Sequence, residues 1–196
     1  MQGNGKIIAV FGSSRCAETS RAYREAQELG RLLARAGFTV LNGGYNGSMA
    51  AISRGAREAG GHVIGVTCAL FDPLLSNPWL SEEIKAANLL SRLEIMMTRA
   101  DGFVAVRGGI GTLSEVMLAW SMLQTRTLRY RPLVLLGDDW QPVVSALCTH
   151  TDLGHSIAAL ARLAATPAAA VETFTSFFAL PSGAPLPTPP GPPALG

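Results

Sequence analysis

Residues 102–115 read GFVAVRGGIGTLSE and combine a strand, a glycine-rich turn and the first turn of a helix. The apolar run at 103–106 is typical of a buried strand. Glycines let backbone N–H groups approach an anion closely, and the N-terminus of a helix adds a partial positive charge. One helical turn further on, a carboxylate would lie near the same anion. The segment therefore predicts a phosphate site with an adjacent acid or base, built from Gly108, Gly109, Gly111, Thr112 and Glu115.

Strands and helices are predicted to alternate on both sides of this segment. The apolar runs that predict strands lie at 6–11, 38–41, 62–66, 84–86, 102–106, 133–136 and 157–163. Helical spacing of apolar residues predicts helices over 19–36, 48–59, 88–100, 112–124, 140–150 and 168–179. The strands are continuous apolar runs, as in a sheet that is covered on both faces. We therefore expect an α/β protein with a Rossmann-like, doubly wound parallel sheet of about six to seven strands.

Three turns rich in glycine or serine directly follow predicted strands, at 12–14, 43–47 and 108–111. The carboxyl ends of parallel strands meet at one edge of the sheet, where ligands bind at a topological switch point. All three turns should therefore border one cleft. The first two would contribute Ser13, Gly43, Gly44 and Gly47.

Length and composition predict one domain over residues 1–180 and a proline-rich tail over 181–196. The tail has the composition of a disordered or polyproline II segment. The net charge is only +2 and the basic residues are scattered, which gives no reason to expect nucleic acid or an anionic membrane as a partner. No apolar stretch reaches the length of a membrane span, and the N-terminal residues lack the apolar run of a signal peptide.

Three cysteines, Cys16, Cys68 and Cys148, lie far apart and without metal-binding spacing. Reduced thiols in a cytoplasmic protein are the expectation. The glycine turns match neither the phosphate loop of P-loop NTPases nor the G-x-G-x-x-G dinucleotide motif, so both of those enzyme classes are set aside.

The spacing of several motifs resembles the Lonely Guy family, formerly labelled lysine-decarboxylase-like. That family has Pro-Gly-Gly-x-Gly-Thr-x-x-Glu after an Ala-Asp and a strand, with an arginine nine residues before the aspartate. The matching residues here are Arg92, Ala100, Asp101, Gly108, Gly109, Gly111, Thr112 and Glu115. A second motif of the family resembles the residues Gly43, Gly44, Gly47 and Met49. The resemblance covers about residues 6–150.

The resemblance implies hydrolysis of the N-glycosidic bond of nucleoside 5′-monophosphates such as AMP or cytokinin riboside monophosphates, without a metal or organic cofactor. It implies Arg92 and Glu115 as catalytic residues. Glu115 would stabilise the positive charge of an oxocarbenium-like transition state or position water, while Arg92 would orient Glu115, hold the sugar phosphate or assist the departing base. The family also implies a homodimer. Phosphate would be held by Gly108, Gly109, Gly111 and Thr112, and the ribose would lie near Ser13, Gly43, Gly44 and Gly47.

Arg107 stands where the family pattern has proline. Its guanidinium would tighten phosphate binding, accompany a shifted ligand or point to solvent. A non-catalytic carrier of a nucleotide or of molybdenum cofactor, with the same fold, is the alternative function. The older lysine-decarboxylase label is rejected because neither lysine of the chain, Lys6 or Lys85, occupies a plausible pyridoxal-phosphate site.

Overall fold

The computed structural model describes residues 5–181, so the tail predicted at 181–196 lies outside the described residues except for Pro181. Its strands are β1 (Ile7–Phe11), β2 (Thr39–Asn42), β3 (Val63–Cys68), β4 (Glu82–Ala86), β5 (Gly102–Ala105), β6 (Leu133–Leu136) and β7 (Ala161–Ala164). Its helices are α1 (Arg21–Arg35), α2 (Ser48–Glu58), α3 (Leu89–Arg99), α4 (Ile110–Gln124), α5 (Trp140–His150), α6 (His155–Ala158) and α7 (Pro167–Phe178). A 3-10 turn, η1 (Ala69–Phe71), follows β3.

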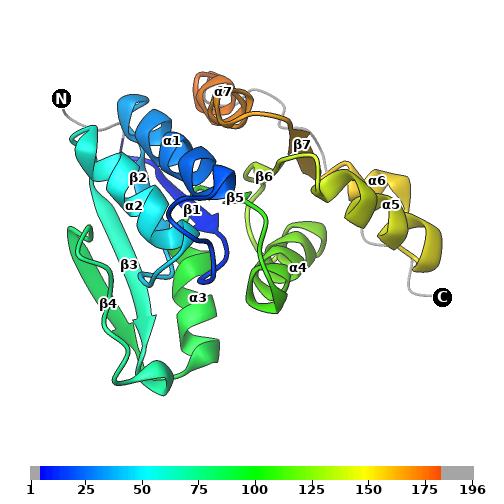
Figure 1. The fold of residues 1–196 in the computed structure, drawn as a ribbon. Coiled ribbons are helices and arrows are strands. Elements are labelled where there is room, and N and C mark those ends of the chain that lie inside the picture. Colours follow the sequence, from blue (N-terminus) through cyan, green and yellow to red (C-terminus); the bar gives the residue numbers. More distant parts are fainter. Residues whose placement is uncertain (1–4, 182–196) are drawn as a thin grey trace.

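All seven described strands pair in parallel in one sheet, in the order β4-β3-β2-β1-β5-β6-β7 (Figure 1). Strand β1 lies between β2 and β5, where Ile8 pairs with Val40 on one side and with Gly102 on the other. The chain winds outward from β1 in both directions, which makes the carboxyl end of β1 the switch point. The predicted doubly wound parallel sheet is confirmed.

Alternate residues of the inner strands contribute to two separate cores. Ile8 and Val10 of β1 pack with α1, α2 and α7, whereas Ala9 and Phe11 pack with α3, α4 and the α5–α6 region. Helices therefore cover both faces of the sheet, which explains why the inner strands are almost entirely buried, whereas the edge strands β4 and β7 carry exposed residues.

Helices α1 and α2 lie side by side on one face because two glycines let their backbones approach (Figure 1). A Cβ atom at Gly30 of α1 would collide with the carbonyl of Ile52, and one at Gly55 of α2 would collide with the carbonyl of Gln27. This close packing fixes the N-terminus of α2 near the carboxyl end of β1.

At most elements the predicted and observed bounds differ by one or two residues, and at two strands the difference has a clear physical reason. The strand predicted at 157–163 is instead the end of α6 followed by β7, because the apolar residues there fit both helical and strand periodicity. The strand predicted at 84–86 begins earlier, at Glu82. Glu82 and Glu83 lie on the sheet edge, where charged side chains remain in solvent and hide the apolar signal of a strand.

Candidate active site

A cavity of about 430 Å³ opens at the carboxyl edge of the sheet, next to the switch point. The loop after β1, the loop after β2, the segment around η1, helix α3 and the start of α4 all contribute to its walls. Of the residues predicted for the site, the structure brings Ser13, Arg92, Gly109, Gly111, Thr112 and Glu115 together around this cavity.

Arg92 of α3 and Glu115 of α4 form a buried ion pair inside the cavity. Nη1 of Arg92 lies 3.3 Å from Oε1 of Glu115, and each side chain is only 9% exposed. The two residues are 23 positions apart, and only the folding of α3 and α4 onto the same face brings them together. A charged pair that remains at the wall of a cavity, rather than being covered by apolar packing, is typical of a functional site.

Burial raises the pKa of the Glu115 carboxyl from the ordinary value of 4.5 to about 7, while the guanidinium of Arg92 acts in the opposite direction. Removing the carboxylate from water disfavours its charged form, and one partner at 3.3 Å offsets only part of that cost. Glu115 can therefore hold or release a proton near neutral pH, as a general acid or base requires.

Three features of the surrounding structure set the position of Arg92. Asn88 caps the start of α3 by accepting a hydrogen bond from the Ser91 amide. Nε of Arg92 donates to the carbonyl of Val66 at the end of β3, over 2.7 Å. A Cβ atom at Gly43 would collide with Nη2 of Arg92, so the glycine after β2 leaves the space that the guanidinium occupies.

The N-terminus of α4 faces the cavity without any side-chain cap. Its N-cap residue is Gly109, and the amides of the first turn belong to residues 110–112. Cβ atoms at Gly109 and Gly111 would meet no protein atom within 4 Å. Both glycines therefore leave open space in front of free N–H groups, which is the arrangement that binds an anion.

Gly108 lies behind this turn and does not line the cavity. A Cβ atom there would collide with Oγ1 of Thr112, so Gly108 makes room for the threonine side chain. The structure therefore gives Gly108 a packing contact and places Thr112 at the cavity wall.

The second glycine loop supports the cavity from beneath. Gly47 has φ +67°, and a Cβ atom there would collide with the carbonyl of Ser13. The next residue, Ser48, donates both its amide and its hydroxyl to that same carbonyl, at 2.8 and 3.0 Å. Gly44, with φ +77°, packs against Thr67 and Gly65 instead. Gly43, Gly44 and Gly47 are therefore close to the cavity but do not line it.

Sequence reasoning missed the apolar wall of the cavity, which consists of Tyr45, Met49, Phe71, Leu74 and Ile110. The ring of Phe71 meets that of Tyr45 edge-on, with centroids 5.7 Å apart. Phe71 and Leu74 come from the irregular segment after β3, which carries no periodicity. Its position after a strand of the same sheet was the available signal, because that places it at the same edge.

Arg107 does not reach this cavity. Its side chain is 76% exposed and lies 3.4 Å from Oδ1 of Asp139, and it lines a different hollow on the other side of the loop. Of the three alternatives for this residue, the structure shows a side chain directed largely to solvent.

Between residues 5 and 181, no cluster of three or more histidine, cysteine, aspartate or glutamate side chains is placed to hold a metal ion. None of the described helices is long and apolar enough to cross a membrane.

The sequence of residues 5–152 matches the SLOG cluster 4 family. A probable cytokinin riboside 5′-monophosphate phosphoribohydrolase of Oryza sativa subsp. japonica is 35% identical over 143 residues, which are 70% of this chain and 61% of that protein. The chain thus spans about three fifths of the rice protein. The cytokinin riboside 5′-monophosphate phosphoribohydrolase of Rhodococcoides fascians is 30% identical over 147 residues, 71% of this chain and 73% of that protein.

Among solved structures, the molybdenum cofactor carrier protein of Chlamydomonas reinhardtii superposes with a TM-score of 0.70. It is 29% identical in sequence, and the alignment covers 89% of this chain and 99% of the carrier protein. Together, the match over residues 5–152 and the similarity to the phosphoribohydrolases confirm the resemblance, and the chain belongs to the SLOG cluster 4 family, among relatives of the Lonely Guy type.

Proposed function

We propose that this protein hydrolyses the N-glycosidic bond of nucleoside 5′-monophosphates and releases a free base and ribose 5-phosphate. One observation carries the proposal: the buried pair of Arg92 and Glu115 lies in the same cavity as the uncapped N-terminus of α4. The rice and Rhodococcoides relatives are named for the same reaction class.

In this proposal, the first turn of α4 binds the 5′-phosphate. The amides of residues 110–112 donate to phosphate oxygens, the hydroxyl of Thr112 adds a further donor, and Gly109 and Gly111 leave room for the anion. Glu115 is three residues beyond Thr112, on the same side of the helix. A ribose that extends inward from the phosphate therefore brings its anomeric carbon toward Glu115.

The chemical step would proceed through an oxocarbenium-like transition state. The bond between the anomeric carbon and the base nitrogen breaks, and its electron pair leaves with the base, which takes up a proton. Water attacks the anomeric carbon and loses a proton, so the sum is nucleotide plus water to base plus ribose 5-phosphate. Ionised Glu115 would stabilise the cationic sugar or accept the proton of water, and Arg92 would hold the carboxylate in place.

The apolar wall formed by Tyr45, Met49, Phe71 and Leu74 supports binding of a planar or prenylated base. We extend the proposal to AMP and to cytokinin riboside monophosphates as substrates, in the cytoplasm, with activation of cytokinins as the outcome where the base is prenylated. No cofactor has a part in this scheme.

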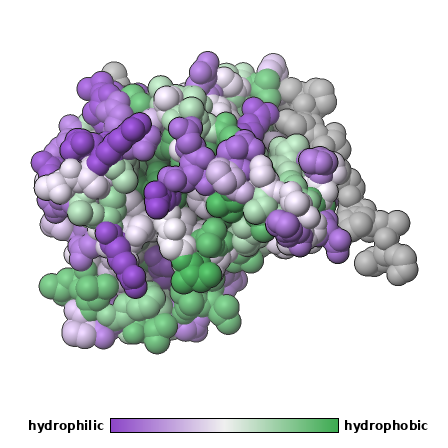
Figure 2. Space-filling view, turned by 45° about the vertical axis from the view of Figure 1, so that its right-hand side comes forward, coloured by the Kyte–Doolittle hydropathy of each residue, from purple (hydrophilic) through white to green (hydrophobic). Residues whose placement is uncertain are grey.

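We also propose that the protein forms a homodimer. Three residues of the cavity wall, Phe71, Leu74 and Ile110, are exposed apolar side chains. Further exposed leucines come from the same segments or from the start of α3, at Leu70, Leu75, Leu89 and Leu90. Figure 2 shows hydrophobic side chains gathered at the bottom of the molecule, the end that carries the η1 segment and the starts of α3 and α4 in Figure 1. Leu75, Leu90 and Ile110 are 83%, 79% and 80% exposed, and a patch of this kind is typical of an interface.

A second candidate function is binding without cleavage, favoured by the likeness to the carrier protein of Chlamydomonas reinhardtii. The two functions differ in their need for Glu115. A site that only binds an anionic ligand gains nothing from a buried carboxylate, which repels phosphate when it is ionised.

Incubation of the protein with AMP, the other nucleoside 5′-monophosphates and isopentenyladenine riboside 5′-monophosphate, followed by chromatography of free bases, tests the proposal. We expect base release from at least one nucleotide and none from the matching nucleoside without phosphate. Absence of release from every nucleotide, with binding retained, would establish the carrier function instead.

A further inference from the structure

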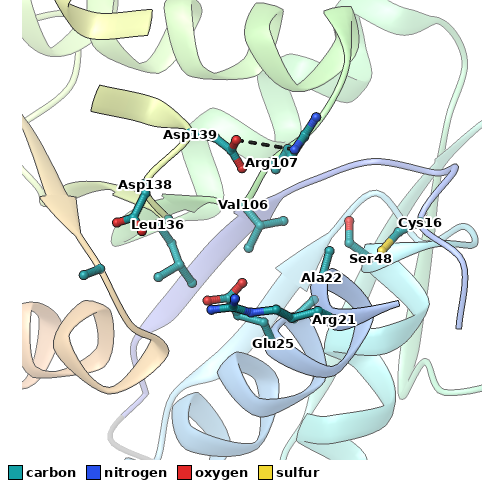
Figure 3. Close-up of a pocket in the computed structure, with 13 residues that line it drawn as sticks. Cys16, Arg21, Ala22, Glu25, Ser48, Val106, Arg107, Leu136, Asp138 and Asp139 are labelled. Carbon is teal, nitrogen blue, oxygen red and sulfur yellow. Dashed lines mark hydrogen bonds and ion pairs between the residues drawn. The ribbon is translucent and has the colours of Figure 1, made fainter. Parts of the chain in front are cut away.

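A second cavity, of about 400 Å³, lies on the other side of the loop that follows β1 (Figure 3). Its walls come from the first turns of α1, from residues 106–107 after β5 and from residues 136–139 after β6. Arg92, Glu115 and residues 109–112 do not take part in it. It is therefore a separate site, and the proposed reaction makes no use of it.

Charged groups of both signs face one another across this cavity. Figure 3 shows Arg21 and Glu25 on α1, opposite Arg107, Asp138 and Asp139. Two guanidinium groups and three carboxylates give a formal sum of 2 − 3 = −1. Such a wall disfavours a simple anion because of its carboxylates, and it disfavours a simple cation because of its arginines.

Most of these charges are unpaired within the described part of the chain. The only ion pair among them there joins Arg107 to Asp139, at 3.4 Å. The half-buried carboxylate of Glu25 and the guanidinium of Arg21 have no hydrogen-bond or ion-pair partner among residues 5–181. Both groups are thus available to a ligand.

The floor between the charged walls is apolar. Ala26, Val106 and Leu136 are at most 8% exposed, and Ala22 adds a further methyl group. An aliphatic group that covers this floor would remove apolar surface from water.

We propose that this cavity binds a small aliphatic zwitterion, namely a free amino acid. Its ammonium group would lie between the carboxylates of Glu25 and Asp138 or Asp139. Its carboxylate would face the guanidinium groups of Arg21 and Arg107, and its side chain would cover the floor. Only a ligand with both charges satisfies both walls, since charge-assisted hydrogen bonds are the strongest polar contacts available here.

A screen of the twenty common amino acids by saturation-transfer NMR, with the full-length protein, tests the proposal. The amino acid that binds best is then compared with its deaminated acid and its decarboxylated amine, which keep the same side chain. We expect saturable binding by at least one amino acid and at least tenfold weaker binding of both analogues. No saturable binding by any of the twenty, or equal binding by either analogue, overturns the proposal.

Variants then locate the site. Glu25→Gln and Arg21→Gln should each weaken binding at least tenfold, whereas Arg35→Gln, at the exposed far end of α1, should leave it unchanged. Glu115→Gln should also leave it unchanged, so the result is independent of the proposed hydrolase activity. Retention of full affinity by both cavity variants would show that the amino acid binds elsewhere.

Discussion

Replacing Glu115 with glutamine should change how the stability of the protein depends on pH. In the folded protein the pKa of Glu115 is about 7, above the ordinary value of 4.5 that applies to the unfolded chain. The folded state therefore binds more protons than the unfolded state between about pH 4.5 and 7. Because of this, the free energy of unfolding falls as the pH rises through that window.

The magnitude follows from the two pKa values. A tenfold change in an acid dissociation constant corresponds to about 1.4 kcal/mol, so the full difference is worth about 3 kcal/mol. Between pH 5 and pH 8, the free energy of unfolding should decrease by about 2.5 kcal/mol of this total. The side chain is 9% exposed, so solvent screening reduces the effect little. Glutamine resembles the protonated carboxyl at every pH. The Glu115→Gln variant should therefore lack this pH-dependent part of the free energy of unfolding.

Urea unfolding of wild type and Glu115→Gln at pH 5 and pH 8 measures the effect. Between the two pH values, the wild type should lose about 2 to 3 kcal/mol more than the variant does. Glu94→Gln, at an exposed position of α3, is the control and should follow the wild type. If Glu115→Gln loses as much stability as the wild type, the carboxyl is not held neutral by burial and the reasoning fails.

Four further outcomes follow from the same geometry. Gly43→Ala should lower kcat by more than about 100-fold with the fold retained, because the new methyl group displaces the guanidinium of Arg92. An unchanged kcat would show that the position of this guanidinium is unimportant for catalysis. In a pH profile, kcat/KM should rise up to about pH 7 and then level off, as Glu115 loses its proton. Arg92→Gln should move this rise to higher pH, because Arg92 lowers the pKa of Glu115. An unmoved profile would show that Arg92 does not influence the ionisation of Glu115. Gly109→Ala should raise KM for the nucleotide roughly tenfold without a loss of stability, since its methyl group enters open space at the anion site. Steady-state kinetics measures the change in KM, and calorimetry measures the stability of the variant. Ile110→Glu should convert a dimer into a monomer in size-exclusion chromatography with light scattering, and a wild type that is already monomeric contradicts the proposed interface.

Most of the sheet could be predicted from the sequence because the inner strands are largely apolar runs and because glycines follow α1 and α2. Gly37, for example, has φ +83° directly after α1, a backbone conformation that glycine adopts without strain. The last strand was placed too early because residues 157–164 suit a helix and a strand equally well. Only the pairing of Ala161 with Leu133 of β6 determines where β7 begins.

The candidate site could be predicted only in part. The anion-binding turn of α4 follows from glycines that are next to one another in the sequence, whereas the contact between Arg92 and Glu115 depends on how two helices pack. Family spacing, rather than periodicity, pointed to that pair. The apolar wall around Phe71 was not predicted, because the segment after β3 has no repeating pattern. The direction of Arg107 depends on Asp139, 32 residues later, and no local pattern determines it.

The central claim is that Glu115 takes part in cleaving the bond between ribose and base. The most direct test measures free base and ribose 5-phosphate from the best nucleotide substrate, for wild type and for Glu115→Gln at pH 8. We predict equal amounts of the two products from the wild type, and loss of both from a variant that remains folded and still binds the nucleotide. Full activity of Glu115→Gln would contradict the claim.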